Sequence, residues 1–189
     1  MIDRAADMAR SPRGLALVAA WAFAEALLLP IVPDVVLLPL VAAAPRTTPR
    51  LALALAVGAL AGSAILVGLV LADPDWTRAL ILGLPGIDAL TFPRVEADVA
   101  AHGVAAFAAV GPGVPLKVYT TVWTATGGSP LVLAVAVVVN RLTRIGPGIV
   151  LAAVLGHVAP RWLRRHERIA FAAYALGWIA LYLVYWGIA

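Results

Sequence analysis

The stretch LLLPIVPDVVLLPL at residues 27–40 decides how this chain folds. It joins the apolar run that begins at Leu15 to a second apolar run, Val35–Ala44. Pro30 and Pro33 lie between the runs, and proline has no backbone N–H and disfavours helix in the residue before it. At about 1.5 Å per residue, neither run alone crosses a hydrocarbon core of about 30 Å. The stretch therefore predicts two half-length helices around a break, which is the pattern of a re-entrant hairpin.

The composition indicates a membrane protein. Of the 189 residues, 63% are hydrophobic and 13% are charged, whereas an average soluble domain has roughly 45–50% and 25%. A mean hydropathy of +0.98 leaves too few polar residues to cover a water-facing surface, which excludes a soluble enzyme, a disordered regulator and a fibrous protein. The absence of cysteine excludes disulfides and zinc–thiolate or iron–sulfur sites. We assign the net charge of +4 to arginines facing an anionic cytoplasmic leaflet rather than to nucleic-acid binding.

A second break repeats the plan of the first. The short apolar run 104–110 meets Gly-Pro-Gly-Val-Pro at residues 111–115, and a second short run, 116–126, follows. Pro112 and Pro115 thus correspond to the first pair of prolines. Paired, proline-interrupted short segments point to an inverted-repeat transporter with its binding site between the breaks. The alternative is coincidence in a chain that has 14 prolines.

Three further runs are long enough to span a bilayer, namely residues 51–72, 131–158 and 169–189. We therefore expect an all-α integral membrane protein with two inverted re-entrant helical hairpins and about three transmembrane helices. The expected hairpins are residues 14–44 and 103–127. The expected organisation is a cytoplasmic N-terminal segment at 1–13, a membrane domain at 14–168 and a C-terminal transmembrane helix at 169–189.

The distribution of charge predicts the orientation. The segment Pro45–Arg50 holds two arginines and no acid, whereas residues 73–102 hold five acids and two arginines, and residues 161–168 hold four arginines. With a re-entrant first hairpin, every arginine-rich segment falls on one side, as the positive-inside rule requires. We therefore expect an integral protein of the plasma (inner) membrane with a cytoplasmic N-terminus. If the first hairpin crossed instead, Arg46 and Arg50 would lie outside.

Five ionisable residues interrupt the apolar stretches: Glu25, Asp34, Lys117, Arg141 and Arg144. Each costs at least about 2.5–3.5 kcal/mol at the bilayer centre, so we expect them to line a polar cavity or a functional site. The two arginines are three residues apart and are expected on one helix face. The sequence Gly-Pro-Gly at residues 146–148 should loosen that helix and free carbonyl groups toward a cavity.

The three bases suit a phosphate or phosphodiester group. Lys117 lies in the first turn after the second break, where backbone N–H groups and the helix dipole favour an anion. Arg141 and Arg144 add fork-shaped hydrogen bonding. We expect Glu25 and Asp34 to gate the site or carry protons. The alternative is a buried network in which the acids only neutralise the arginines.

Other chemistries have little support. The three histidines are scattered without the spacing of metal ligands, and no nucleophile motif or nucleotide-binding glycine pattern is present. We expect no metal, no cofactor and no enzymatic activity.

The residues around both breaks resemble a known family. Phe23-Ala24-Glu25 followed by residues 30–40 resembles the first signature of the DedA family (the VTT, or SNARE-associated, domain), especially its short YqaA-like branch. Residues 111–120 followed by Gly-Gly-Ser-Pro at 127–130 resemble the second signature. Asn140-Arg141 falls where that branch usually has Gly-Arg. The similarity covers roughly Trp21 to Leu155.

The resemblance implies two opposed re-entrant hairpins and transport or scrambling of lipids, including polyprenyl-phosphate carriers, often linked to the proton gradient. It also implies acidic roles for Glu25 and Asp34 and basic roles for Lys117 and Arg141. We therefore expect a lipid transporter or flippase that acts on phosphate-bearing membrane lipids. The sequence is compatible with a monomer or an oligomer. The alternatives are a structural or assembly protein, and a small-ion exchanger.

Overall fold

The computed structural model describes residues 1–108 and 114–188, and this part of the chain is helical with no strand. Three of its helices are long and apolar enough to cross a membrane: Pro45–Ala72, Pro130–Val158 and Glu167–Gly187. This confirms an all-helical chain with about three membrane-length helices, and such helices indicate a membrane protein. Pro112 of the second break lies outside the described residues.

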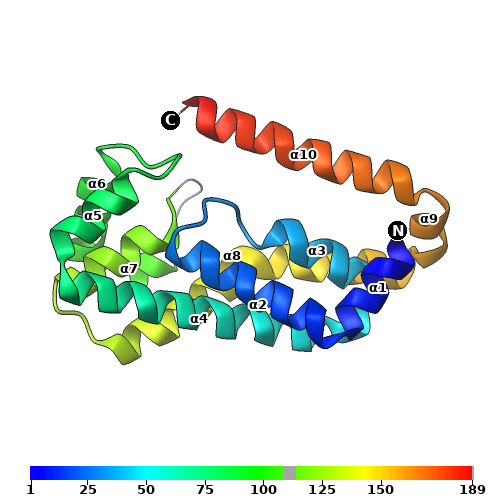
Figure 1. The fold of residues 1–189 in the computed structure, drawn as a ribbon, viewed down its shortest axis with the longest axis horizontal. Coiled ribbons are helices and arrows are strands. Elements are labelled where there is room, and N and C mark those ends of the chain that lie inside the picture. The colour runs from blue at the N-terminus through cyan, green and yellow to red at the C-terminus, as the bar shows by residue number, and fades with distance from the viewer. Residues whose placement is uncertain (109–113, 189) are drawn as a thin grey trace.

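Figure 1 shows the helices lying mostly along one long axis. In chain order they are α1 (Ile2–Arg10), α2 (Pro12–Leu27), α3 (Asp34–Ala43), α4 (Thr48–Ala72), α5 (Pro74–Leu82), α6 (Thr91–His102), α7 (Leu116–Ala125), α8 (Pro130–Val158), α9 (Pro160–Arg165) and α10 (Glu167–Ile188). Two 3-10 segments, η1 (Pro45–Thr47) and η2 (Gly103–Phe107), precede α4 and follow α6.

The first pair of prolines separates two short helices, as the sequence predicts. Ser11 begins α2, since its Oγ accepts a hydrogen bond from the Gly14 N–H at 3.1 Å, and Pro12 occupies the first helical position. The helix ends at Leu27, ahead of Pro30, and α3 begins at Asp34. Neither helix alone has the length of a membrane span.

Close glycine contacts show that the chain doubles back at this break. On α4, Gly58 lies against Ala19 of α2 and Gly62 lies against Phe23. The residue numbers of the contacting positions increase together on the two helices, so α2 and α4 run in the same direction. The connecting helix α3 must therefore return toward the start of α2, and Figure 1 shows it doing so, with α1 beside it.

The same reasoning places α8 beside the returning helix. Gly148 lies next to Leu38, and Gly156 lies against the Ala42 carbonyl, so α3 and α8 run in the same direction. The two helices that flank the break therefore pack on different partners, α2 on α4 and α3 on α8. This arrangement brings residues near position 30 close to the middle of α8.

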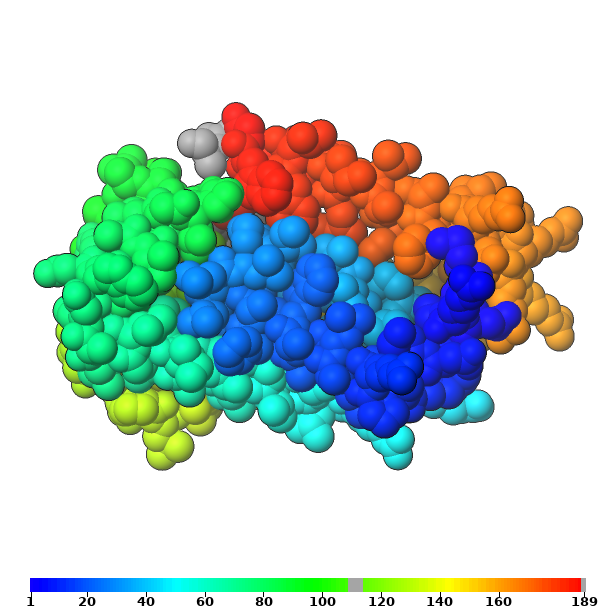
Figure 2. Space-filling view, in the orientation of Figure 1, coloured from blue at the N-terminus to red at the C-terminus, as the bar shows by residue number. Residues whose placement is uncertain are grey.

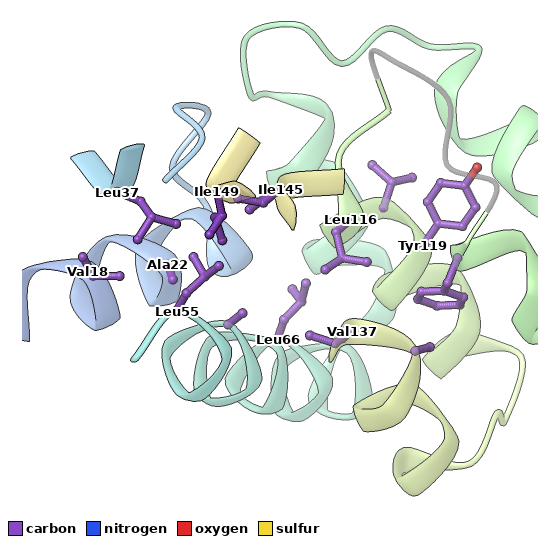
Figure 3. Packing of buried hydrophobic residues seen from close by; sticks show 14 of the residues in the cluster. Val18, Ala22, Leu37, Leu55, Leu66, Leu116, Tyr119, Val137, Ile145 and Ile149 are labelled. Atoms are coloured by element: carbon purple, nitrogen blue, oxygen red, sulfur yellow. The ribbon is translucent and has the colours of Figure 1, made fainter. Parts of the chain in front are cut away.

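Most of the core consists of small and aliphatic side chains, joined by the aromatic rings of Phe92, Phe107 and Tyr119, and α10 contributes no buried residue among those described. Figure 3 shows Ala22 of α2, Leu55 and Leu66 of α4, Leu116 of α7 and Ile145 of α8 in one buried cluster. Each of these five is 3% exposed or less. In the bilayer this interior is held by close packing rather than by exclusion of water, which explains its glycines and alanines.

Basic and acidic segments collect at opposite ends of the molecule. The N-terminus, η1 and α9 lie at one end, and Asp3 forms an ion pair with Arg164 at 3.1 Å. The helices α5 and α6, which carry most of the acidic segment 73–102, lie at the other end (Figure 1). The long axis of the bundle therefore separates the two kinds of charge.

Two details of the structure refine the sequence prediction. The Gly-Pro-Gly sequence at residues 146–148 does not end helix α8, which continues through Pro147 to Val158. In the first arm of the second expected hairpin, the described residues up to 108 form the 3-10 segment η2 over Gly103–Phe107 rather than an α-helix. An apolar run beginning after a glycine at φ +56° need not start as an α-helix.

The close approach of α2 and α4 yields a test. A Cβ added at Gly58 would lie 2.1 Å from the Ala19 carbonyl oxygen, whereas one added at Gly68 on the same helix meets nothing within 4 Å. We expect Gly58→Ala to lower the free energy of unfolding by about 1–3 kcal/mol. The matched variant Gly68→Ala should be neutral or raise it by up to about 1 kcal/mol. Denaturant titration in detergent micelles measures both, and equal effects would contradict the packing.

Candidate functional site

The first break leaves backbone groups without helical partners. In a continuous helix the Leu29 carbonyl would accept from the amide of residue 33, but Pro33 has no N–H. The Lys117 ammonium, in the first turn of α7, donates a hydrogen bond to this carbonyl at 2.9 Å. Lys117 is 2% exposed. A lysine from the second half of the chain therefore supplies the hydrogen bond that the backbone lacks at the break in the first half.

Two further side chains bind the break. The Trp21 indole N–H donates to the Ile31 carbonyl at 3.1 Å, and the Val32 N–H donates to the Tyr182 hydroxyl at 2.7 Å. Irregular backbone at membrane depth is tolerated only where protein or water supplies such partners. The break is thus a fixed structural element held from α2, α7 and α10.

A buried ion pair lies next to the break. The Arg141 guanidinium on α8 donates to the Glu25 carboxylate on α2, and the two residues are 3% and 5% exposed. Lys117 is close enough to interact electrostatically with both. The neighbouring Asn140 amide donates to the Phe107 carbonyl at 2.8 Å. These contacts fix α8 between the two halves of the chain.

The remaining two ionisable residues lie on the more open side of this cluster. Asp34 is half-buried and interacts electrostatically with Arg144, Arg141 and Glu25. Arg144 is exposed, and within the described residues its guanidinium has no hydrogen-bond or salt-bridge partner. The structure thus brings together all five residues singled out by the sequence, with one cation left uncommitted.

The two arginines do not play equivalent parts, contrary to the expectation that they share one face. Arg141 points into the bundle and Arg144 does not. Three residues along a helix correspond to a rotation of about 60° around the axis. That rotation separates the buried side of α8 from its exposed side. Pro115, the described proline of the second break, immediately precedes α7 and so positions Lys117.

Sequence reasoning missed the contribution of α10. From the sequence, Trp178, Tyr182, Tyr185 and Trp186 read as an aromatic belt at the membrane surface. A different set recurs every four residues: Tyr174, Trp178, Tyr182 and Trp186. In the structure their rings follow one another along one face of the helix, and two of the hydroxyls contact the break region. Tyr174 donates to the Asp34 carbonyl at 2.7 Å. The period of four was the available signal, since it places all four rings on one face.

The cluster combines lysine and arginine side chains with two carboxylates. Within residues 1–108 and 114–188, no group of His, Cys, Asp or Glu side chains is arranged to hold a metal ion. Two carboxylates face three cations, which leaves an excess positive charge beside the break. An anion at Arg144 would compensate that charge, and Asp34 is the carboxylate placed to respond to it.

Comparison with known proteins gives no relative for this chain. No family model, no curated protein and no solved structure matches it. Its function is therefore argued from the geometry above and from the motifs around the two breaks.

The Glu25–Arg141 pair can be tested by a double-mutant cycle. Glu25→Gln or Arg141→Met alone leaves a buried charge unpaired, and each should lower the free energy of unfolding by about 3–5 kcal/mol. The double variant should lose much less free energy of unfolding than the two single variants lose together, because it leaves no member of this pair charged and unpaired. Denaturant titration in micelles measures the coupling.

The exposed pair Arg78–Glu96 is the matched control. Removing either partner there should cost about 0–1 kcal/mol, since water and salt screen both charges. Additive losses at Glu25 and Arg141 would mean that the two charges do not stabilise each other.

Proposed function

We propose that this protein moves membrane lipids with anionic, phosphate-bearing headgroups across the bilayer. The observation that carries the proposal is the uncommitted guanidinium of Arg144. Arg144 is the midpoint of Pro130–Val158, a helix of membrane-spanning length. A cation at that depth is unfavourable unless an anion or water accompanies it. A phosphate-bearing headgroup supplies such an anion and suits the fork of an arginine.

The arrangement of the break supports a passage for the headgroup. The helices α2 and α3 enter and leave at the same end of the bundle, whereas α7 lies toward the opposite end (Figure 1). In a bilayer these would be two hairpins dipping from opposite faces, the geometry of inverted-repeat transporters. The resemblance of both breaks to the DedA signatures favours the same function. We place the N-terminus on the cytoplasmic side of the plasma (inner) membrane, because the basic end contains it.

Each charged residue has a role in this proposal. Arg144 binds the headgroup, and the buried cations Lys117 and Arg141 keep the region electropositive. Asp34 competes with the headgroup for Arg144 and takes up a proton when the headgroup binds. Glu25 neutralises Arg141. Transport is then coupled to protons through one carboxyl group.

A second candidate is a structural or assembly protein whose buried charges only stabilise the fold. The full burial and mutual pairing of Glu25 and Arg141 favour this interpretation for those two residues. It gives no role to the exposed guanidinium of Arg144, which lies near Asp34 without a salt bridge among the described residues, and this is why we prefer transport. A small-ion exchanger would show ion flux without lipid movement.

The proposed orientation can be tested because the chain has no cysteine, so any introduced cysteine is unique. Arg50→Cys lies at the basic end and Asp75→Cys at the acidic end, and both positions are exposed. In oriented inner-membrane vesicles, an impermeant maleimide should label position 50 from the cytoplasmic side only and position 75 from the opposite side only. Labelling with the sides exchanged would refute the proposed orientation.

The transport role of Arg144 can be tested in proteoliposomes. Movement of a fluorescent anionic phospholipid is followed by adding an impermeant reductant, which removes the fluorescence of lipid in the outer leaflet only. The fluorescence that is lost afterwards measures lipid arriving from the inner leaflet. We expect Arg144→Gln to slow movement by about tenfold or more, since a charge-assisted contact to phosphate is lost. Arg165→Gln, an exposed arginine on α9, should leave the rate unchanged. Equal rates for Arg144→Gln and the original chain would refute the proposed role.

A further inference from the structure

A long groove separates α10 from the break of the first hairpin. Its volume is about 420 Å³, within the range of about 300–1,000 Å³ that is typical of ligand pockets. Its wall is almost entirely carbon. Ile31 and Val35 form one side, and the face of α10 that includes Trp178 and Tyr182 forms the other.

Helix α10 is held away from the bundle by side-chain tips rather than by close backbone packing. No residue of Glu167–Gly187 is buried. Tyr174 and Tyr182 bind the backbone of Asp34 and Val32, and the Tyr185 hydroxyl donates to the Gly86 carbonyl at 3.0 Å. Figure 2 shows α10, in orange and red, along one margin of the molecule beside the blue atoms of the first hairpin. Phenols along the helix thus keep the groove open at a fixed width.

One end of the polar cluster lies near this groove, since Asp34 precedes Val35 in the groove wall and its carbonyl accepts a hydrogen bond from Tyr174. Arg144 interacts electrostatically with Asp34 and with the hydroxyls of Tyr182 and Tyr185, two residues of α10. Asp34 also lies 3.8 Å from the Cβ position at Gly148, one turn along α8 from Arg144. An exposed cation therefore lies beside a groove whose walls are apolar.

We propose that the groove holds one hydrocarbon chain of an anionic lipid whose headgroup is bound by Arg144. The inference rests on the proposed function, since it assigns the second half of the same substrate. An apolar slot beside a single unpaired cation matches the two ends of such a lipid. The aromatic face of Trp178 and its neighbours provides a rigid apolar wall for the chain.

The occupant is a lipid rather than a second copy of this protein, because charge complementarity requires an anion at the groove's mouth. A second copy would bring its own apolar α10 face and no compensating charge. The lipid-facing side of α10 remains available for bulk lipid, so the groove and the outer face of one helix can be compared directly.

The test uses quenching of tryptophan fluorescence by brominated lipid chains. The protein is reconstituted into phosphatidylcholine vesicles containing a minor fraction of either dibrominated phosphatidylglycerol or dibrominated phosphatidylcholine. The signal of Trp178 is the difference between the original chain and Trp178→Phe. We expect the anionic brominated lipid to quench this signal several-fold more than the zwitterionic one.

The matched control moves the indole to the other side of the same helix. In the double variant Trp178→Phe with Ala180→Trp, the ring lies about 3 Å further along the axis and about 200° around it, on an exposed face that does not line the groove. Both brominated lipids should quench this position equally. In Arg144→Gln, the preference at Trp178 should disappear while quenching by both lipids remains.

Blocking the groove gives an independent variant. Ala175 lines the groove and is exposed, so Ala175→Phe should fill it, lower quenching at Trp178 and leave the control position unchanged. Equal quenching of Trp178 and of the control position by both lipids would overturn the proposal, since Trp178 would then contact only bulk lipid. Absence of quenching at Trp178 would also overturn it, and a dimer in detergent would then identify a second copy as the occupant.

The outcomes separate this inference from the proposed function. Lipid preference at Trp178 without lipid movement in proteoliposomes would leave a lipid-binding protein and refute transport. Movement that depends on Arg144 without preference at Trp178 would leave transport and refute the groove as the chain's site.

Discussion

The hydrogen bond from Lys117 to the Leu29 carbonyl is the contact on which the rest of the structure depends. Two prolines in four residues create a break that is unfavourable in an apolar environment, because the freed carbonyl groups have no water to bind there. A lysine from the other half of the chain meets that need. Its burial in turn requires nearby negative charge, and Glu25 provides it while also pairing with Arg141. The unpaired backbone carbonyl at the break thus accounts for the buried lysine, and the lysine accounts for the buried carboxylate beside it.

Once the break is fixed, the course of the long helices follows. The chain doubles back after α2, so α4 runs alongside α2 in the same direction, and only glycine at positions 58 and 62 permits that approach. The returning α3 then lies along α8 and brings the break to the middle of that span. The guanidinium of Arg144, at the middle of α8, is consequently near the carboxylate of Asp34, although the two residues are far apart in the sequence. The site is a result of how the first hairpin returns.

The sequence predicted the helical class, the membrane-length helices and the division of α2 from α3, because these depend on local properties such as apolar length and proline spacing. It also selected the five charged residues, because charge in an apolar run stands out whatever the fold. It did not predict which of them pair. The difference between Arg141 and Arg144 arises from a rotation of about 60° relative to neighbours that sequence does not locate.

The role of α10 shows the limit of reading residues by type alone. Tyrosine and tryptophan near the end of a span suit the membrane surface, yet here Tyr174 and Tyr182 bind the backbone at the break. A phenol has one polar group at the end of an apolar ring, so it can satisfy a backbone group while keeping the space around it apolar. A bulk lipid could not do both. The helix therefore holds the break through its hydroxyl groups and lines the adjacent groove with its apolar rings.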